Sequence, residues 1–220
     1  MGSQPPDSLN EYLEKLEAHS HPVLEEMERL AKEKDFPIIG HQCGKRMAIL
    51  AHAIGAKRVF EVGSGFGYST LWFAMAVGSD GVVMHTEFDE KNSNLAREFL
   101  GKAGLSDRCR FLIGDGLLLL QKERGPFDCI LIDCDKKQYP LALQEAVAKL
   151  RVGGLLFAHN VIWSGRVASQ DNEPSTEAIR KYNKEIMGHP ELLSYIDPVH
   201  DGLAVSVKIP LGLKQNWHLD

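Results

Sequence analysis

Hydrophobic residues follow one spacing before Gly55 and another after it. From about residue 8 to residue 34 they recur every three or four positions, which is typical of helices that bury one face. The pattern predicts two helices there, the second beginning at Pro22, because proline is favoured in the first helical turn. A third helix is predicted from about Gln42 to Ile54, where Gly55 ends it. The chain therefore opens with N-terminal helices over about residues 8–55.

After Gly55, short apolar runs alternate with helical segments. The strands are predicted at Arg58–Val62, Val82–Glu87, Arg110–Ile113, Phe127–Ile132 and Leu155–Ala158. The helices between them are predicted at Ser69–Val77, Glu90–Ala103, Gly116–Lys122 and Pro140–Leu150. Near-continuous apolar strands are typical of a parallel sheet covered on both faces. Repeated strand–helix units indicate an α/β fold with a doubly wound sheet and right-handed crossovers.

The pattern changes once more near the end of the chain. A further helix is predicted at about Ser175–Met187, followed by apolar runs at Leu192–Ile196 and Ala204–Ile209. The turn around His200-Asp201-Gly202 between those runs is short, which favours an antiparallel pair at the end of the sheet. With no internal repeat or linker, residues 1–220 are predicted to form a single domain, with the α/β core at about residues 56–210.

Composition excludes several classes of partner. The net charge of -5 and the absence of a basic stripe argue against nucleic acid. No run approaches the roughly 18 apolar residues that span a bilayer, and the polar N-terminus lacks a signal-peptide core. The four cysteines show no C-x-x-C spacing, so we expect a reduced, cytoplasmic protein rather than a disulfide scaffold.

The stretch from Glu61 to Ser69 joins the first strand to a helix through Gly63, Gly65 and Gly67. Such a turn can place backbone N–H groups and a helix N-terminus beside a nucleotide-like ligand, although many similar turns only reverse the chain. The pattern here is G-x-G-x-G, and Tyr68 stands where the dinucleotide pattern G-x-G-x-x-G has its last glycine. A bulky residue at that position argues against NAD or FAD.

Two acidic residues sharpen the identity of the ligand. Glu87 ends the second predicted strand, where an acid can accept hydrogen bonds from ribose hydroxyls. A ribose ligand without a pyrophosphate suggests S-adenosylmethionine. Glu61 interrupts an apolar strand, so its carboxylate needs a partner from the loop or from a cationic ligand group. The third strand ends in Gly114-Asp115-Gly116, which could line the adenine side, whereas Asp115 could equally cap the next helix.

Several blocks of the chain together resemble one known family, the class I S-adenosylmethionine-dependent O-methyltransferases of the catechol and caffeoyl-CoA type. The matching blocks are Ile39–Gly44, Phe60–Ser69, Leu131–Tyr139, Gly153–Leu156, Asn160–Gly165 and Asp201–Leu203. The resemblance covers roughly Asp35 to Ile209. No single block is specific alone, but their combination and order are.

The resemblance implies a seven-stranded, mostly parallel sheet with a reversed last strand, usually in a homodimer. It also implies methyl transfer to a phenolic hydroxyl with help from a divalent metal. Asp133 matches the first metal ligand, Asn160 another, and Lys136 the lysine near the acceptor hydroxyl. The predicted cofactor site comprises Glu61, Gly63, Gly65, Tyr68, Ser69, Glu87, Gly114, Asp115, Gly116 and Asp133.

The chemistry needs these residue types. A catechol hydroxyl is mostly protonated at pH 7, and a bound divalent cation lowers the pKa of that hydroxyl and orients both oxygens. A nearby lysine, here Lys136, can take the proton or can stabilise the phenolate as a cation. Asp133 closes the fourth strand at its carboxyl end, the edge where open α/β sheets bind ligands. Lys136 and Asp133 are therefore the predicted catalytic residues.

The chain departs from the family at His159-Asn160, where the family typically has Asp-Asn. Mg²⁺ and Ca²⁺ prefer oxygen ligands, whereas Mn²⁺, Fe²⁺, Co²⁺ and Zn²⁺ accept imidazole. Three interpretations follow. The site could select such a softer metal through Asp133, His159 and Asn160; it could be a weakened metal site; or the enzyme could be metal-independent, with His159 as a base. A purely structural hydrogen-bonding role for His159 is a fourth.

Three further positions bear on the acceptor. Asp135 could replace the lost carboxylate or contact the acceptor, or it could be a surface acid. Ala204 lies in a region where the catechol enzymes carry an acid, which makes a simple catechol a less certain substrate. Trp163 and the loop Ser164–Pro174 are expected to wall the acceptor pocket, unless Trp163 is a core residue.

The sequence therefore favours an S-adenosylmethionine-dependent O-methyltransferase acting on a small aromatic hydroxyl. The alternatives are a metal-independent small-molecule methyltransferase, a non-catalytic S-adenosylmethionine-binding protein and, more distantly, a NAD-dependent oxidoreductase. The presence of Lys136 and Asn160 argues against the non-catalytic alternative.

Overall fold

The computed structural model describes residues 12, 16 and 21–214. These residues form two compact units, one ending at Pro37 and one beginning at Ile38. Helix α2 (Pro22–Glu33) lies in the first unit and begins at the predicted proline. The His21 ring caps it by accepting a hydrogen bond from the Val23 N–H at 3.3 Å. The helix predicted before residue 20 lies almost entirely outside the described residues.

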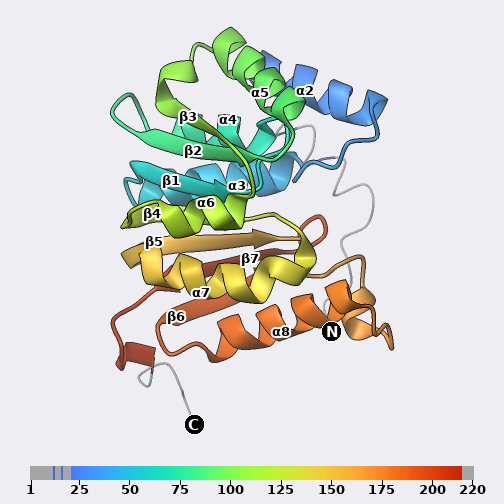
Figure 1. Cartoon of the computed structure of the whole chain (residues 1–220), viewed down its shortest axis with the longest axis vertical. Helices are drawn as coiled ribbons and strands as arrows, with labels where there is room; N and C mark the ends of the chain where they lie inside the picture. The colour runs from blue at the N-terminus through green and yellow to red at the C-terminus, as the bar shows by residue number, and fades with distance from the viewer. Residues whose placement is uncertain (1–11, 13–15, 17–20, 215–220) are drawn as a thin grey trace. The chain divides into compact units, whose positions relative to one another are not determined.

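The second unit is built on a seven-stranded sheet in the order β3-β2-β1-β4-β5-β7-β6 (Figure 1). The strands are β1 (Arg58–Val62), β2 (Val82–Glu87), β3 (Cys109–Ile113), β4 (Phe127–Ile132), β5 (Leu150–His159), β6 (Leu192–Asp197) and β7 (Leu203–Lys208). Strand β7 runs antiparallel to both β5 and β6, and the pairs from β3 to β5 are parallel. The predicted mostly parallel sheet with a reversed last strand is confirmed.

Helices cover both faces of this sheet. The helices of the second unit are α3 (His41–Ala53), α4 (Tyr68–Ala76), α5 (Glu90–Lys102), α6 (Gly116–Lys122), α7 (Tyr139–Lys149) and α8 (Pro174–Gly188). In Figure 1, α6, α7 and α8 lie in front of the sheet and α3 and α4 lie behind it. Short 3₁₀ turns are found at η1 (Ser106–Arg108), η2 (Lys136–Gln138) and η3 (Arg166–Ala168).

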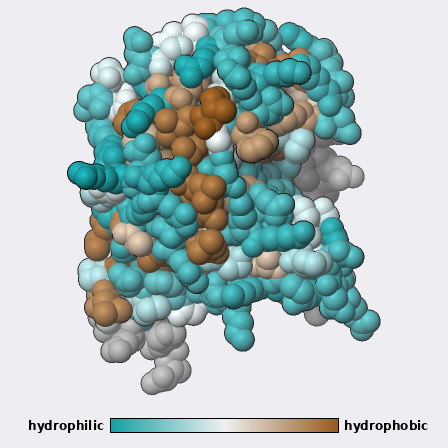
Figure 2. Space-filling view, in the orientation of Figure 1, coloured by the Kyte–Doolittle hydropathy of each residue, from teal (hydrophilic) through white to brown (hydrophobic). Residues whose placement is uncertain are grey.

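The outer surface of the front face is mainly hydrophilic, with a limited group of hydrophobic side chains over its centre (Figure 2). Helices α6 and α7 expose Leu118 and Leu141 to solvent. No helix within the described part of the chain is long and apolar enough to cross a membrane. Cys43, Cys109, Cys129 and Cys134 are all free.

Two strands differ from their predicted form. Strand β3 lies at the sheet edge and none of its residues is fully buried, so it is not covered on both faces as predicted. Strand β5 begins at Leu150 rather than at Leu155, because Gly153 and Gly154 continue the strand instead of ending a turn. A Cβ on Gly154 would lie 2.9 Å from the Asp128 carbonyl oxygen of β4, so only glycine permits this close pairing.

The order of the strands indicates where on the sheet a ligand would bind. Strand β1 pairs with β2 on one side and with β4 on the other, so the chain changes direction across the sheet between β1 and β4. Open α/β sheets bind ligands at such a switch point, beyond the carboxyl ends of the strands. The residues that follow β1, β4 and β5 are therefore brought to one edge.

Candidate functional site

The loop between β1 and α4 is shaped by its glycines. Gly63 has φ +90°, and a Cβ there would lie 2.3 Å from the Asp133 carbonyl oxygen. Gly67 has φ +91°, and a Cβ there would lie 2.7 Å from the Cβ of Ala96 on α5. Any other residue would be strained and would collide, so glycine is required for both conformation and close approach. The loop thus lies directly against the segment that follows β4. Gly65, which lies between Gly63 and Gly67 in the chain, also has a positive φ of +51°.

The partners of Glu61 lie in the loop and in the first turn of α4. Its carboxylate is fully buried and accepts hydrogen bonds from the hydroxyls of Ser64, Ser69 and Thr70. The Thr70 oxygen in turn lies 3.0 Å from Nδ1 of the buried His85. Burial raises the pKa of Glu61 to about 7, although the three hydroxyls oppose the rise. Glu61 therefore ties the loop and the first turn of α4 to β1.

The predicted ribose side lies where β2 and β3 end. Glu87 is only partly buried, and its Oε1 accepts a hydrogen bond from the Asp89 N–H at 2.9 Å. The Gly114 N–H donates to the Glu87 carbonyl oxygen at 2.9 Å, which places the two strand ends side by side. A Cβ on Gly116 would lie 2.9 Å from the Gly63 nitrogen, so this segment also packs against the glycine loop.

Asp115 caps α6, which confirms the capping interpretation. Its Oδ1 accepts a hydrogen bond from the Leu118 N–H at 3.0 Å, and its Oδ2 accepts one from Gln138 Nε2 at 2.9 Å. Burial raises the pKa of Asp115, but these hydrogen bonds outweigh burial and the net pKa is lowered. Both carboxylate oxygens of Asp115 are therefore used in structural hydrogen bonds. Gly114 and Gly116 are its neighbours in the chain.

On the acceptor side, Asp133 and Lys136 form an ion pair just beyond β4. Lys136 Nζ lies 3.1 Å from Asp133 Oδ1 and 2.9 Å from the Tyr139 hydroxyl. Tyr139 donates its own proton to the His159 carbonyl oxygen at 2.7 Å. Burial raises the pKa of Asp133, but the Lys136 charge and the His159 ring outweigh it and hold that pKa well below its ordinary value. Tyr139, which was not among the predicted site residues, links Lys136 to β5. Its spacing of one 3₁₀ turn from Lys136 was the available signal.

His159 ends β5 facing the same ion pair. The side chain is 3% exposed, and its Nδ1 lies 3.5 Å from Asp133 Oδ2. That distance is long for a hydrogen bond, and Nδ1 is a buried atom with no hydrogen-bond partner. The other ring nitrogen, Nε2, lies 3.2 Å from His200 Nδ1. Asp135 does not join this group, because it is exposed and caps η2 through the Lys137 N–H.

Asn160 is held by an acid from the turn before β7. Its Nδ2 donates to Asp201 Oδ2 at 2.9 Å, and the Ser164 N–H donates to Asp201 Oδ1 at 2.5 Å. Asp201 therefore fastens the predicted metal ligand to the loop that follows β5. The sequence predicts Asp201 in a turn and carries no signal of its partners, because Asn160 and Ser164 lie 41 and 37 residues away in the chain.

Strained backbone conformations cluster at this same edge of the sheet. Of the five non-glycine residues with positive φ in the described ranges, four are Asn160, Trp163, Ser164 and His200. Such conformations cost free energy, and they persist where the surrounding structure fixes them. Their clustering marks this edge as the constrained part of the fold.

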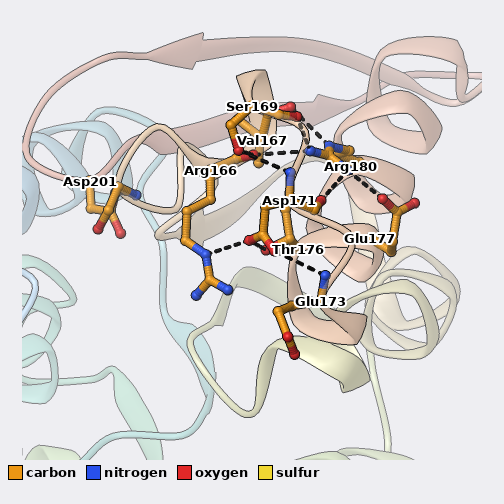
Figure 3. A network of polar contacts seen from close by, with 10 residues as sticks. Arg166, Val167, Ser169, Asp171, Glu173, Thr176, Glu177, Arg180 and Asp201 are labelled. Atoms are coloured by element: carbon orange, nitrogen blue, oxygen red, sulfur yellow. Dashed lines mark hydrogen bonds and ion pairs between the residues drawn. The ribbon is translucent and has the colours of Figure 1, made fainter.

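The loop after β5 is held rigidly by α8 (Figure 3). The Arg180 guanidinium donates to the carbonyl oxygens of Arg166, Val167, Ser169 and Asp171 and pairs with Glu177. Arg166 pairs with Asp171 and lies 5.7 Å from the centroid of the Trp163 ring. Lys136 Nζ is also 5.7 Å from that centroid.

Trp163 is a partly buried core residue, the second of its two predicted roles, and its part in an acceptor pocket stays a prediction. The ring packs against the hydrophobic core, and it also lies next to Lys136. Of the predicted metal ligands, Asp133 and His159 lie side by side, and Asn160 follows His159 in the chain with its amide held by Asp201. The described residues contain no group of three or more His, Cys, Asp or Glu side chains arranged to hold a metal ion. The candidate set is thus one carboxylate, one imidazole and one amide.

A doubly wound sheet with a reversed last strand, and a glycine loop at its switch point, define a Rossmann-like α/β protein with a ligand site at that edge. A family model described as O-methyltransferase matches residues 14–209. The catechol O-methyltransferase of Mycobacterium tuberculosis (strain ATCC 25618 / H37Rv) is 31% identical over 196 residues, which cover 87% of this chain and 89% of that protein. The caffeoyl-CoA O-methyltransferase of Eucalyptus gunnii is 29% identical, with 77% and 73% covered.

A solved structure supports the same family. The crystal structure of an O-methyltransferase from Bacillus cereus in complex with SAH (S-adenosylhomocysteine) has a TM-score of 0.82 and 28% identity over 91% of this chain and 97% of that one. The chain therefore belongs to the O-methyltransferase family. It is an S-adenosylmethionine-dependent enzyme.

Proposed function

We propose that this enzyme transfers a methyl group to one hydroxyl of a small aromatic acceptor with adjacent hydroxyls, catechol-like or hydroxycinnamoyl-type, with help from a divalent metal. The observation that carries the proposal is the convergence of Asp133, Lys136 and His159 directly beside the glycine loop. Relatives named catechol and caffeoyl-CoA O-methyltransferase support the acceptor class.

The methyl donor is proposed to lie along the carboxyl ends of β1, β2 and β3. S-adenosylmethionine carries the methyl group on a sulfonium, and the acceptor oxygen displaces it in line. The backbone N–H groups at the start of α4, at Tyr68 and Ser69, suit the carboxylate of the methionine part. Glu87, with its side chain partly exposed, suits the ribose hydroxyls. Glu61 acts indirectly, by fixing Ser64 and Ser69.

Lys136 is proposed to stabilise the acceptor oxygen as charge develops on it. An ammonium group has three donors, and two are engaged by Asp133 and Tyr139. The third is free to donate to an acceptor oxygen that enters beside Trp163. The ion pair with Asp133 holds the Lys136 amine in place for electrostatic stabilisation of that oxygen.

The metal is supported by the unpartnered atom of His159. Two ligand atoms about 2.1 Å from one ion lie about 3.0–3.4 Å apart, depending on the coordination angle. His159 Nδ1 and Asp133 Oδ2 are 3.5 Å apart, and Nδ1 is buried without a hydrogen bond. Asp133, His159 and Asn160 would hold the ion, and an imidazole ligand favours Mn²⁺, Fe²⁺, Co²⁺ or Zn²⁺ over Mg²⁺. Such an ion would lower the pKa of the acceptor hydroxyl and orient it.

A radiolabelled methyl assay over catechols and hydroxycinnamoyl esters, with and without metal, tests the proposal. Activity with an adjacent diol that is abolished by EDTA and restored by Mn²⁺ is the expected result. Full activity after demetallation would reject the metal. It would leave a metal-independent enzyme as the second candidate. The Lys136–Asp133 ion pair favours that candidate, because Lys136 already places a cationic side chain beside Asp133. No methyl transfer to any phenol would reject the acceptor class.

A further inference from the structure

The turn between β6 and β7 brings a second histidine to the site. His200 lies in this turn, which is closed by the Gly202 N–H donating to the Val199 carbonyl oxygen at 2.9 Å. Leu203, which begins β7, pairs with His159 at the end of β5. The two imidazole rings are therefore adjacent, with centroids 5.3 Å apart and planes inclined by 33°.

The position of the His200 ring is fixed by its surroundings. Its backbone has φ +53°, a left-handed conformation that is costly for a residue with a side chain. The ring lies against Gly40, where a Cβ would come within 3.1 Å of His200 Cδ2. Gly40 itself has φ +74°. The fold thus keeps room for this ring at Gly40 and holds the turn in a strained form that aims the ring at β5.

The contact between the rings accommodates a proton on either nitrogen of His159, and the tautomer sets which ring donates. A neutral imidazole has one N–H donor and one lone-pair acceptor. If Nε2 of His159 carries the proton, it donates to His200 Nδ1 at 3.2 Å, and the lone pair of Nδ1 faces Asp133. If Nδ1 carries the proton instead, that buried N–H faces the Asp133 carboxylate at the long distance of 3.5 Å, and His200 donates to Nε2. Only the first tautomer leaves the lone pair of Nδ1 available to a metal ion.

Metal-binding histidines usually donate their second ring N–H to a neighbouring acceptor, which fixes the tautomer and orients the ring. We propose that His200 is such a positioning residue: it accepts the Nε2 proton of His159 and leaves Nδ1 as the atom that binds the metal next to Asp133. This inference rests on the proposed metal-assisted function and deepens it. His200 itself is not a ligand, because its Nδ1 faces His159 Nε2 and not the carboxylate.

Two variants separate the hydrogen bond from the backbone strain. His200→Asn keeps an acceptor near the position of Nδ1, and asparagine tolerates a positive φ. His200→Gly removes the ring and also relieves the strain, so loss of folding is not expected. His52→Asn is the control, because His52 lies near the end of α3, where its Nδ1 is 3.4 Å from the Ala76 carbonyl oxygen.

Two readouts that are independent of catalysis test the inference. The concentration of free Mn²⁺ is measured by electron paramagnetic resonance while the metal-free full chain is titrated with Mn²⁺. His200→Gly is expected to bind Mn²⁺ about 10- to 100-fold more weakly than wild type. His200→Asn and His52→Asn are expected to stay within about threefold of it. Long-range ¹H–¹⁵N spectra of the ¹⁵N-histidine-labelled metal-free protein are expected to show the Nε2–H tautomer for His159, with His159→Asn providing the assignment.

An Nδ1–H tautomer in the wild type, unchanged Mn²⁺ affinity in His200→Gly, or a wild type that binds no Mn²⁺ would each overturn the inference. These outcomes are distinct from failure of the acceptor proposal. A protein that methylates none of the phenols, yet loses Mn²⁺ affinity in His200→Gly as described, supports the inference and rejects the acceptor.

Discussion

Glu61 is a fully buried acid whose ionisation is costly in the folded protein. Burial raises its pKa from 4.5 to about 7, so the folded state binds this proton more tightly than the unfolded state does. The folded protein therefore holds more protons than the unfolded chain between pH 4.5 and about pH 7, and the contribution of Glu61 to stability falls as pH rises through that range.

The variant Glu61→Gln removes this dependence. Relative to wild type, the free energy of unfolding of the variant is expected to rise by about 3 kcal/mol between pH 4.5 and pH 8. Urea unfolding of both proteins at several pH values measures the difference. A constant difference across that range would show that Glu61 has an ordinary pKa.

Lys136 is expected to matter for the reaction and not for binding of the methyl donor. Lys136→Ala should lower kcat by about 10²- to 10⁴-fold, because it removes the charged donor aimed at the acceptor oxygen. Affinity for S-adenosylhomocysteine, measured by calorimetry, should stay the same. Lys137→Ala is the matched control, since that exposed neighbour uses only its backbone N–H to cap η2. A kcat for Lys136→Ala close to wild type would contradict the proposed role.

At the scale of elements, one side chain of α8 organises the whole loop after β5. Arg180 donates to four carbonyl oxygens of this loop with one planar group, and one of them, that of Arg166, also accepts from Ser169 (Figure 3). The loop adjoins Trp163 and, through Ser164 and Asp201, the predicted ligand Asn160. Loss of order in this loop should therefore weaken binding of the acceptor and leave binding of the methyl donor unchanged.

Arg180→Lys keeps the charge but cannot reach all of these oxygens. We expect the KM for the acceptor to rise about tenfold, equivalent to about 1.4 kcal/mol, while the KM for S-adenosylmethionine is unchanged. Lys181→Ala serves as the control, because Lys181 is 62% exposed and pairs only with Glu185 on the same helix. Equal changes in both KM values would indicate general destabilisation and would contradict a specific effect on the loop.

At the scale of the whole molecule, binding of the methyl-donor product should stabilise the fold, because the proposed site joins β1, β2, β3 and β4. A ligand at about 100 times its Kd adds about 2.7 kcal/mol to the free energy of unfolding, which raises Tm by about 5–10 °C for a chain of this size. S-adenosylhomocysteine should give that shift and NAD should give none in a thermal unfolding assay. The reverse order would contradict the assignment of the ligand.

Much of the fold could be predicted because its signals are local. Strands β1, β2 and β4 begin and end where predicted, since each is a short apolar run bounded by polar or turn residues. Asp115 and Pro22 mark helix starts through chemistry that acts within one turn. Strand β5 was predicted too short because Gly153 and Gly154 usually signal a turn, and only the pairing with β4 shows why glycine is needed inside a strand.

The sequence by itself determined the order of the elements, the glycine loop and the presence of Asp133, Lys136, His159 and Asn160 at strand ends. Those features depend on local spacing and on the common edge that a parallel sheet creates. The tertiary structure alone decided the partners: Tyr139 with Lys136, His200 with His159, and Asp201 with Asn160. Two of these pairs join residues about forty positions apart, because the reversed strand β7 carries its turn back beside β5. No local spacing encodes that contact, which sets His200 beside His159 and Asp201 beside Asn160.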